Sequence, residues 1–226
     1  SGLLYGPHVL PDLYFWLGSL SMSGGSVEWL RSVLGPDRPS YSDLQTLAAG
    51  SGPQPTGILY FPYLSGKGSA AGDGAAFLGL SAAHTRADLV RAVLEGTAYE
   101  IERLRRAAEA ANGTPIEKLV AVGGGTRLSS WLQIKADVSG VPVEVLPQRE
   151  ATLLGAAMLA GRATGLASDA RWPHGAPPAE RYTPDPHRHA HYRAIFESQY
   201  LPLAQSFLPT RGGTDIPPSK GGRGVP

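Results

Sequence analysis

The stretch Lys118-Leu-Val-Ala-Val-Gly-Gly-Gly125, with the segment Thr126–Val138 that follows it, decides the fold class of this chain. The apolar run predicts a buried strand, and the three glycines predict a turn. The segment after the turn predicts a helix, because Trp131, Ile134 and Val138 recur on one face at helical spacing. A strand, a glycine turn and a helix start in succession form a common anion-binding arrangement, since glycine amides can approach an anion and the first helical N–H groups are free.

The glycine turn matches neither of two familiar phosphate-binding motifs. No Gly-Lys-Ser/Thr follows it, as in the Walker A loop, and its spacing is not that of the dinucleotide fingerprint. Three glycines after a strand are weak evidence by themselves. An anion-binding turn and a tight connection without a ligand are therefore equally good interpretations of the motif alone.

The composition is that of a globular protein with a core of its own. The chain has 226 residues, of which 42% are hydrophobic and 17% charged. A net charge of +1 gives no reason to expect a nucleic-acid partner. The absence of cysteine excludes disulfides and thiolate metal sites. No apolar run approaches the ~20 residues of a membrane span, and no signal peptide is visible, so we expect no membrane partner and a cytoplasmic location.

The rest of the chain alternates predicted strands and helices, which indicates an α/β fold. Strands are expected at Asp12–Leu17, Ile58–Leu64 and Val141–Leu146. Helices are expected at Val27–Leu34, Tyr41–Ala49, Thr85–Asn112, Glu150–Ala163 and His191–Phe207. The longest begins with a capping box, Thr85 to Asp88, and ends at Gly113. We expect Val141–Leu146 to lie near a sheet edge and Glu150–Ala163 to be buried on nearly every side.

The polar residues predict mostly solvated surfaces. The charged residues of the longest helix are expected on its outer face: Arg91, Glu95, Glu102, Arg103, Arg106 and Glu109. Four histidines in a proline-rich segment are interpreted as a solvated turn rather than a metal site: His174, His187, His189 and His191. We do not expect a catalytic base among the acids Asp73, Asp88, Asp137 and Glu150. Asp137 in particular is expected to lie on the surface of a helix.

A series of segments resembles, in order, the C-terminal domain of FGGY-type carbohydrate kinases, with the xylulokinase-like branch the most similar. The segments lie in register over roughly 57–165: Leu59–Gly66, Phe77–Leu80, His84–Gly96, Gly123–Arg127, Trp131–Asp137, Gly140–Val143 and Glu150–Ala157. The resemblance implies an actin-like ATPase (ribonuclease H-like) domain, with a mixed sheet flanked by helices and apparently without its first strands. It further implies a nucleotide-binding domain over 1–208, and 209–226 is expected to be a disordered tail.

The resemblance also implies an activity, in which the γ-phosphoryl group of ATP, with Mg2+, passes to a sugar or polyol hydroxyl, a xylulose-like pentulose being favoured. The nucleotide-binding residues that it implies are Gly24, Glu28, Gly124, Gly125, Thr126 and Ser129. Those of the glycine turn would cradle phosphates, and Ser129 would contact adenine. Gly24 and Glu28 would form a second helix start beside the nucleotide.

Several expected parts of such a kinase are missing from this chain. No segment of the chain resembles the family's N-terminal domain, which carries most of the sugar pocket and the catalytic aspartate. The family's Gly-Thr-Ser turn and the strands expected ahead of His8 also have no counterpart. We therefore expect the isolated chain to be inactive and the sugar to bind mainly through the missing domain. A second copy of the chain is a possible partner, in a homodimer. Gly66-Lys67-Gly68 also replaces the family's Gly-Glu-Arg. Two alternatives stay open: a pseudokinase module that acts by protein association, and an ATPase half unrelated to sugars.

Overall fold

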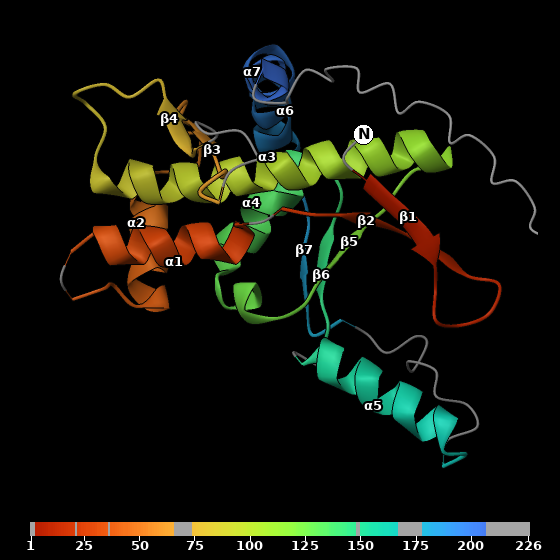
Figure 1. Cartoon of the computed structure of the whole chain (residues 1–226). Coiled ribbons are helices and arrows are strands. Elements are labelled where there is room, and N and C mark those ends of the chain that lie inside the picture. The colour runs from red at the N-terminus through yellow and green to blue at the C-terminus, as the bar shows by residue number, and fades with distance from the viewer. Residues whose placement is uncertain are drawn as a thin grey trace, which may run out of the picture.

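Helix α3 (Arg86–Asn112) runs through the molecule, and most other elements pack around it (Figure 1). The computed structural model describes residues 3–20, 22–35, 37–65, 74–147, 150–166 and 178–206. Both predicted ends of α3 are confirmed. The backbone N–H of Thr85 donates to Asp88 Oδ2 at 2.7 Å, and Gly113 has the left-handed φ of +70° that stops a helix. Local sequence therefore sets the length of the central helix.

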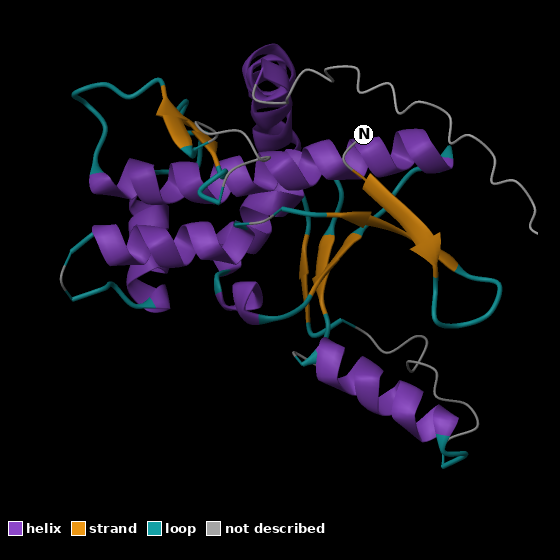
Figure 2. Cartoon of the chain, in the orientation of Figure 1, coloured by secondary structure: helices purple, strands orange, loops and turns teal. Residues whose placement is uncertain are grey.

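The strands form three small sheets (Figure 2). Strands β1 (Leu3–Pro7) and β2 (Tyr14–Gly18) make an antiparallel hairpin, and β3 (Leu59–Phe61) pairs antiparallel with β4 (Ala76–Leu78). The third sheet has the order β5 (Leu119–Ala121), β6 (Val143–Val145), β7 (Glu180–Tyr182). It is mixed, because β5 pairs parallel with β6 and β7 pairs antiparallel with it. Sequence patterns did not predict β1, β4 or β7. The apolar run does form β5, but the prediction that this strand is buried is wrong, since Val120 is 50% exposed.

The remaining helices are α1 (Ser23–Val33), α2 (Tyr41–Gly50), α4 (Ser129–Ser139), α5 (Ala151–Ala163), α6 (Pro186–Ile195) and α7 (Leu201–Ser206). A 3-10 turn, η1 (Gly124–Arg127), precedes α4, and a π-helical turn, η2 (Phe196–Tyr200), joins α6 to α7. None of these described helices combines the length and the apolar character that a membrane crossing requires. The predicted helix over Thr126–Val138 is thus a short 3-10 turn followed by an α-helix.

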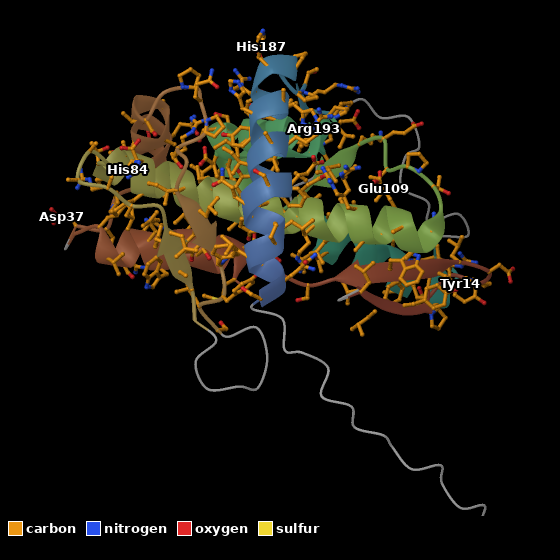
Figure 3. All side chains as sticks on the ribbon, turned by 90° about the horizontal axis from the view of Figure 1, so that it is seen from above. Tyr14, Asp37, His84, Glu109, His187 and Arg193 are labelled. Carbon is orange, nitrogen blue, oxygen red and sulfur yellow. The ribbon has the colours of Figure 1, made fainter. Side chains whose placement is uncertain are left out.

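Aromatic residues fill the core where α6 and its continuation cross α3, as the view from above shows (Figure 3). The rings of Phe61 and Tyr200 stack at 4.7 Å, and Tyr99 lies 4.8 Å from Tyr200. On the same helix, a Cβ added at Gly96 would stand 2.1 Å from the carbonyl oxygen of Tyr60. Only glycine permits this approach, so α3 and β3 pack backbone to backbone.

The prediction that β6 lies near a sheet edge is wrong, since β6 is the central strand of its sheet. All three of its residues are buried. Pro142 suggested an edge because proline cannot donate to a ladder. It precedes the strand, however, and its carbonyl accepts from the N–H of Leu119 at 2.9 Å. The proline therefore costs the sheet no hydrogen bond.

The prediction that Glu150–Ala163 is a buried helix is also wrong. Helix α5 has no buried residue, and Leu153 is 68% exposed. In Figure 1, α5 lies apart from the other described elements, beyond the end of the β5–β6–β7 sheet. Apolar residues around a helix favour burial, but they do not supply a surface to pack against.

The charged face predicted for α3 is partly wrong, because Arg91, Glu95 and Glu102 are buried. Nε of Arg91 lies 2.9 Å from Oε1 of Glu95, and the hydroxyl of Tyr192 donates to the same oxygen at 2.9 Å. Glu102 is held between Arg105 and Arg106, at 2.7 and 2.6 Å. Ion pairs and hydrogen bonds allow these charges to be buried.

Asp137 and the described histidines also differ from their predictions. Asp137 is buried rather than exposed, and its Oδ2 lies 2.6 Å from Nε of Arg188. His187, His189 and His191 lie on α6, which begins at Pro186 rather than at His191. Proline suits the first turn of a helix, since its missing N–H would have no intrahelical partner there. The prediction read this proline as a helix breaker.

Some predictions fall outside the described residues. These concern the altered loop Gly66-Lys67-Gly68, the residues Asp73 and His174, and the tail over 209–226.

Candidate functional site

The predicted site residues belong to two helical segments: Gly24, in the first turn, and Glu28 lie on α1, and the others lie on η1 and at the start of α4. The start of α1 is fixed to β3, because the hydroxyl of Tyr60 donates to Oγ of the buried Ser26 at 3.0 Å. The start of α4 is fixed to α2, because Ser130 donates to Oε1 of Gln45 from its N–H at 3.1 Å and from its hydroxyl at 3.0 Å. Gln45 thus satisfies one of the N–H groups that a helix start leaves free.

The glycine turn η1 is closed by its own residues. Gly123 has a φ of +83°, which favours glycine, and its carbonyl accepts from the N–H of Thr126 at 3.2 Å and from the Thr126 hydroxyl at 2.8 Å. Thr126 is buried. Both of its donors are therefore engaged within the turn, which gives Thr126 a role in shaping the turn.

The glycines at the two helix starts differ in what surrounds them. A Cβ added at Gly24 or Gly124 would meet no described atom within 4 Å. The backbone at both positions therefore faces open space, as close approach of a ligand requires. A Cβ at Gly125 would lie 3.0 Å from Cζ3 of Trp131, so this glycine is needed for packing as well. Trp131 is itself held by α3, because its Nε1 donates to Oγ1 of Thr97 at 2.9 Å.

Glu28 is held as a carboxylate beside these helix starts. It accepts from the hydroxyl of Tyr41 at 2.5 Å and from Nη1 of Arg31 at 3.0 Å, and Arg38 lies 3.7 Å away. The hydrogen bond from Tyr41 lowers the pKa of Glu28, with smaller contributions from the arginines, although burial opposes them. The Glu28 side chain is still 43% exposed, so an oxygen can accept a further donor.

Tyr41 connects the two helix starts. Its hydrogen bond to Glu28 raises the pKa of its hydroxyl, and the charge of Arg127 in η1 acts on it in the opposite direction. Helix α2 makes this connection, because Tyr41 donates to Glu28 of α1 and Gln45, one turn later, accepts from Ser130 of α4. Ser129, the first residue of α4, is exposed beside Arg127. Of the predicted site residues, Glu28 contacts Tyr41, which sequence patterns did not single out; the capping box from Ser40 to Asp43 marks the start of α2 but not this partner.

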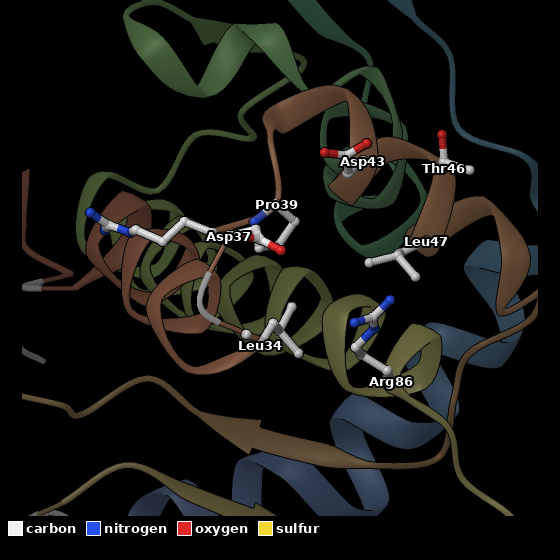
Figure 4. A pocket seen from close by; sticks show the side chains of 9 residues that line it. Leu34, Asp37, Pro39, Asp43, Thr46, Leu47 and Arg86 are labelled. Atoms are coloured by element: carbon white, nitrogen blue, oxygen red, sulfur yellow. The ribbon is translucent and has the colours of Figure 1, made fainter.

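A hollow lies next to this site rather than within it (Figure 4). It measures about 500 Å3 and lies between the end of α1, α2 and the start of α3. Its lining residues are Leu34, Gly35, Asp37, Arg38, Pro39, Asp43, Thr46, Leu47 and Arg86. None of the predicted site residues lines it, and Arg38, which pairs with Glu28, connects the two.

Metal ligands are not gathered at the site. Among the residues that the structure describes, no three or more His, Asp or Glu side chains are arranged to hold a metal ion. Glu28 is engaged by Tyr41 and Arg31.

Comparisons with known proteins point to one family. A profile of the FGGY family of carbohydrate kinases, C-terminal domain, matches residues 3–164. The chain is 34% identical over 165 residues to a xylulose kinase of Staphylococcus epidermidis, which covers 70% of this chain and 32% of that protein. It is 38% identical over 155 residues to a glycerol kinase of Gloeobacter violaceus, with 67% and 31% covered. The crystal structure of xylulose kinase from Rhodospirillum rubrum matches with a TM-score of 0.70 at 29% identity, over 91% of this chain and 43% of that one. The chain spans about a third of the length of the curated relatives it matches.

Proposed function

Because the chain belongs to the FGGY family of carbohydrate kinases and corresponds to their C-terminal domain, we propose that it is the ATP-binding half of such a kinase. The whole enzyme would transfer the γ-phosphoryl group of ATP to a hydroxyl of a sugar or polyol. The fold agrees with this assignment, since the solved relatives are kinases with an actin-like ATPase fold. We treat residues 1–208 as one nucleotide-binding domain with its core at about 57–165.

One observation supports ATP binding more than the others. Helix α2 connects the two glycine-bearing helix starts through Tyr41 and Gln45, and at Gly24 and Gly124 their backbones face open space. Free N–H groups at a helix start attract phosphate oxygens. A nucleotide lying across both starts would reach each of them with a different part.

The residues divide between the parts of the nucleotide. The backbone of Gly124 and Gly125 would hold phosphate oxygens, while Thr126 keeps the turn closed from behind. Ser129 would contact the adenine edge, and Glu28 would accept from a ribose hydroxyl beside the open Gly24. Mg2+ would arrive on the phosphate oxygens, because it commonly keeps such ligands and waters in place of a protein cage.

The sugar is assigned less directly. The relatives include xylulose kinases and glycerol kinases, and the sequence resembles the xylulokinase branch. We therefore favour a pentulose such as xylulose as the acceptor, bound mainly by the N-terminal domain of the whole enzyme. The catalytic base would also belong to that domain, so the isolated chain would bind nucleotide without phosphorylating a sugar. A cytoplasmic location, where ATP is available, is part of this proposal.

The test compares two glycine substitutions that the fold tolerates equally. Neither Gly124 nor Gly50 has a described atom within 4 Å of an added Cβ, and neither has a positive φ. Gly124→Ala should obstruct the phosphates, whereas Gly50→Ala, at the end of α2, should not. In a thermal-shift titration with Mg-ATP, the wild-type chain and Gly50→Ala should be stabilised, by about 2.7 kcal/mol at 100 times Kd.

Gly124→Ala should show a smaller shift at every nucleotide concentration. Equal shifts in the two variants would contradict ATP binding at the glycine turn. Production of ADP and xylulose phosphate by this chain alone would contradict the assignment of the catalytic base to another domain.

A further inference from the structure

A cation lies on the tryptophan that supports the glycine turn, and the site described above does not use it. Nζ of Lys135 is 3.7 Å from the centre of the Trp131 ring. Lys135 is partly buried, and among the described residues no carboxylate forms an ion pair with it. Attraction between an ammonium group and the face of an indole ring strengthens when the pair is removed from water. Trp131, rather than a counter-ion, therefore holds the Lys135 ammonium in place.

The Trp131 ring has little freedom to move. Only 2% of the residue is exposed, and Nε1 is fixed by the hydroxyl of Thr97, which itself donates to the carbonyl of Leu94 at 2.9 Å. The opposite edge of the ring supports the turn, since Cζ3 would be 3.0 Å from a Cβ on Gly125. The position of the ring therefore limits how closely the backbone of Gly125 can approach the core.

These contacts place Lys135 one aromatic ring away from the backbone of the turn. Resting on the proposed function, we propose that Lys135 is a positioning residue for the nucleotide. Because the fixed Trp131 ring holds its ammonium group, Lys135 keeps a positive charge behind the turn that receives the phosphates. Lys135 itself touches no ligand in this arrangement, because Trp131 lies between.

The charge of Lys135 should depend on pH in an accessible range. Burial lowers the pKa of Lys135 to about 8. The elements packed against α4 carry charged or titratable groups that include Tyr41 and Asp43 of α2, Arg91 and Glu95 of α3, Arg127 of η1, Glu144 of β6, Arg181 and Tyr182 of β7, and Arg188 and His189 of α6. Arginine stays charged, the hydrogen bond from Lys118 lowers the pKa of Glu144, and burial raises the pKa of Tyr182 to about 12. The charge of Lys135 itself changes just above neutrality.

The sign of the effect follows from linkage. A bound phosphate favours the ammonium form, so it raises the pKa of Lys135 above its value in the free protein. The contribution of Lys135 to nucleotide affinity is complete below about pH 8 and is lost as the pH rises through the pKa values of the free and bound states. A screened charge at this separation should change the affinity about fivefold.

The experiment measures the Kd of Mg-ADP for the full chain by calorimetry between about pH 7 and about pH 9.5, where the phosphates stay ionised. The wild-type affinity should fall about fivefold over this range. Lys135→Met should bind about fivefold more weakly at the lower pH and show no further loss. Lys135→Arg should keep the affinity at both ends, because arginine does not titrate there. Lys118→Met, which removes a lysine paired with Glu144 on the sheet, should behave as the wild type.

Fluorescence supplies a second readout. The difference in emission between the wild type and Trp131→Phe gives the emission of Trp131 alone. This emission should change with pH near pH 8 as Lys135 loses its charge, and it should not change there in the Lys135→Met background. This inference is overturned, and the proposed function stands, if the Trp131 emission changes with pH while the nucleotide affinity does not. The same holds if Lys135→Met binds nucleotide as the wild type does at every pH. If the wild-type chain binds no nucleotide, both are overturned. Lys135→Arg keeps the test decisive even if Lys135→Met is less stable.

Discussion

Replacement of Arg91 by methionine would leave the Glu95 carboxylate buried without its counter-ion. Glu95 is 1% exposed, and Arg91 is its nearest cation, with Nε 2.9 Å from Oε1. The same arginine donates to the carbonyl of Pro53 at 3.0 Å and to that of Gly52, so the loop after α2 would lose two bonds as well. Removal of one partner of a buried ion pair typically costs 3–5 kcal/mol. We expect Arg91→Met to lower the free energy of unfolding by about 4 kcal/mol at neutral pH.

The pH dependence of this loss is a sharper test than its size. Burial raises the pKa of Glu95 above its ordinary value even beside Arg91, and without the arginine the pKa should rise further. A carboxyl whose folded pKa is raised favours the folded state below its unfolded pKa and loses that contribution as the pH rises through the folded pKa. The deficit of Arg91→Met should therefore shrink as the pH is lowered from 7 toward about 4.5.

Urea unfolding of the wild type, Arg91→Met and Arg91→Met/Glu95→Gln measures both effects, with Arg181→Met as the control. Arg181 pairs with Glu144 but is 54% exposed, so its loss should cost below about 1 kcal/mol. The double variant should recover part of the deficit at neutral pH, because glutamine leaves no buried charge. A deficit in Arg91→Met that is equal to that of Arg181→Met, or that does not change with pH, would refute the reasoning.

Two further predictions concern the start of α3 and the exposed surface of α5. Hydrogen bonds from Ser51 and Thr85 lower the pKa of Asp88 to about 2, so Asp88→Asn should cost about 1 kcal/mol at neutral pH. That difference should vanish in acid as Asp88 protonates between about pH 4 and 2, and urea unfolding at several pH values would show whether it does. Leu153 of α5 is 68% exposed, so Leu153→Ala should change stability by less than about 0.5 kcal/mol, and a loss of 2 kcal/mol or more on thermal melting would mean that α5 packs as a core helix.

The candidate site was predictable in its backbone but not in its surroundings. The glycine turn follows from local sequence, whereas α1 begins at Ser23, four residues before the predicted start at Val27. The resemblance to the kinase family assigned both segments to a nucleotide. The structure adds two residues of α2: Tyr41, which donates a hydrogen bond to Glu28, and Gln45, which accepts from the N–H of Ser130 at the start of α4. These partners lie far from the turn in sequence, so no periodicity could connect them. Whether the predicted residues bind ATP remains a prediction.

The sequence alone determined the elements whose signals are local. The ends of α3 follow from a capping box and a left-handed glycine, and the β5–turn–α4 unit follows from an apolar run, three glycines and helical spacing. Only the tertiary structure decided which charges are buried and which apolar faces are not. Glu95 and Asp137 lie in the interior because Arg91, Tyr192 and Arg188 neutralise or hydrogen-bond them, whereas α5 stays exposed because no described element packs on it. Burial depends on partners brought together from distant parts of the chain, and hydrophobic periodicity carries no record of them.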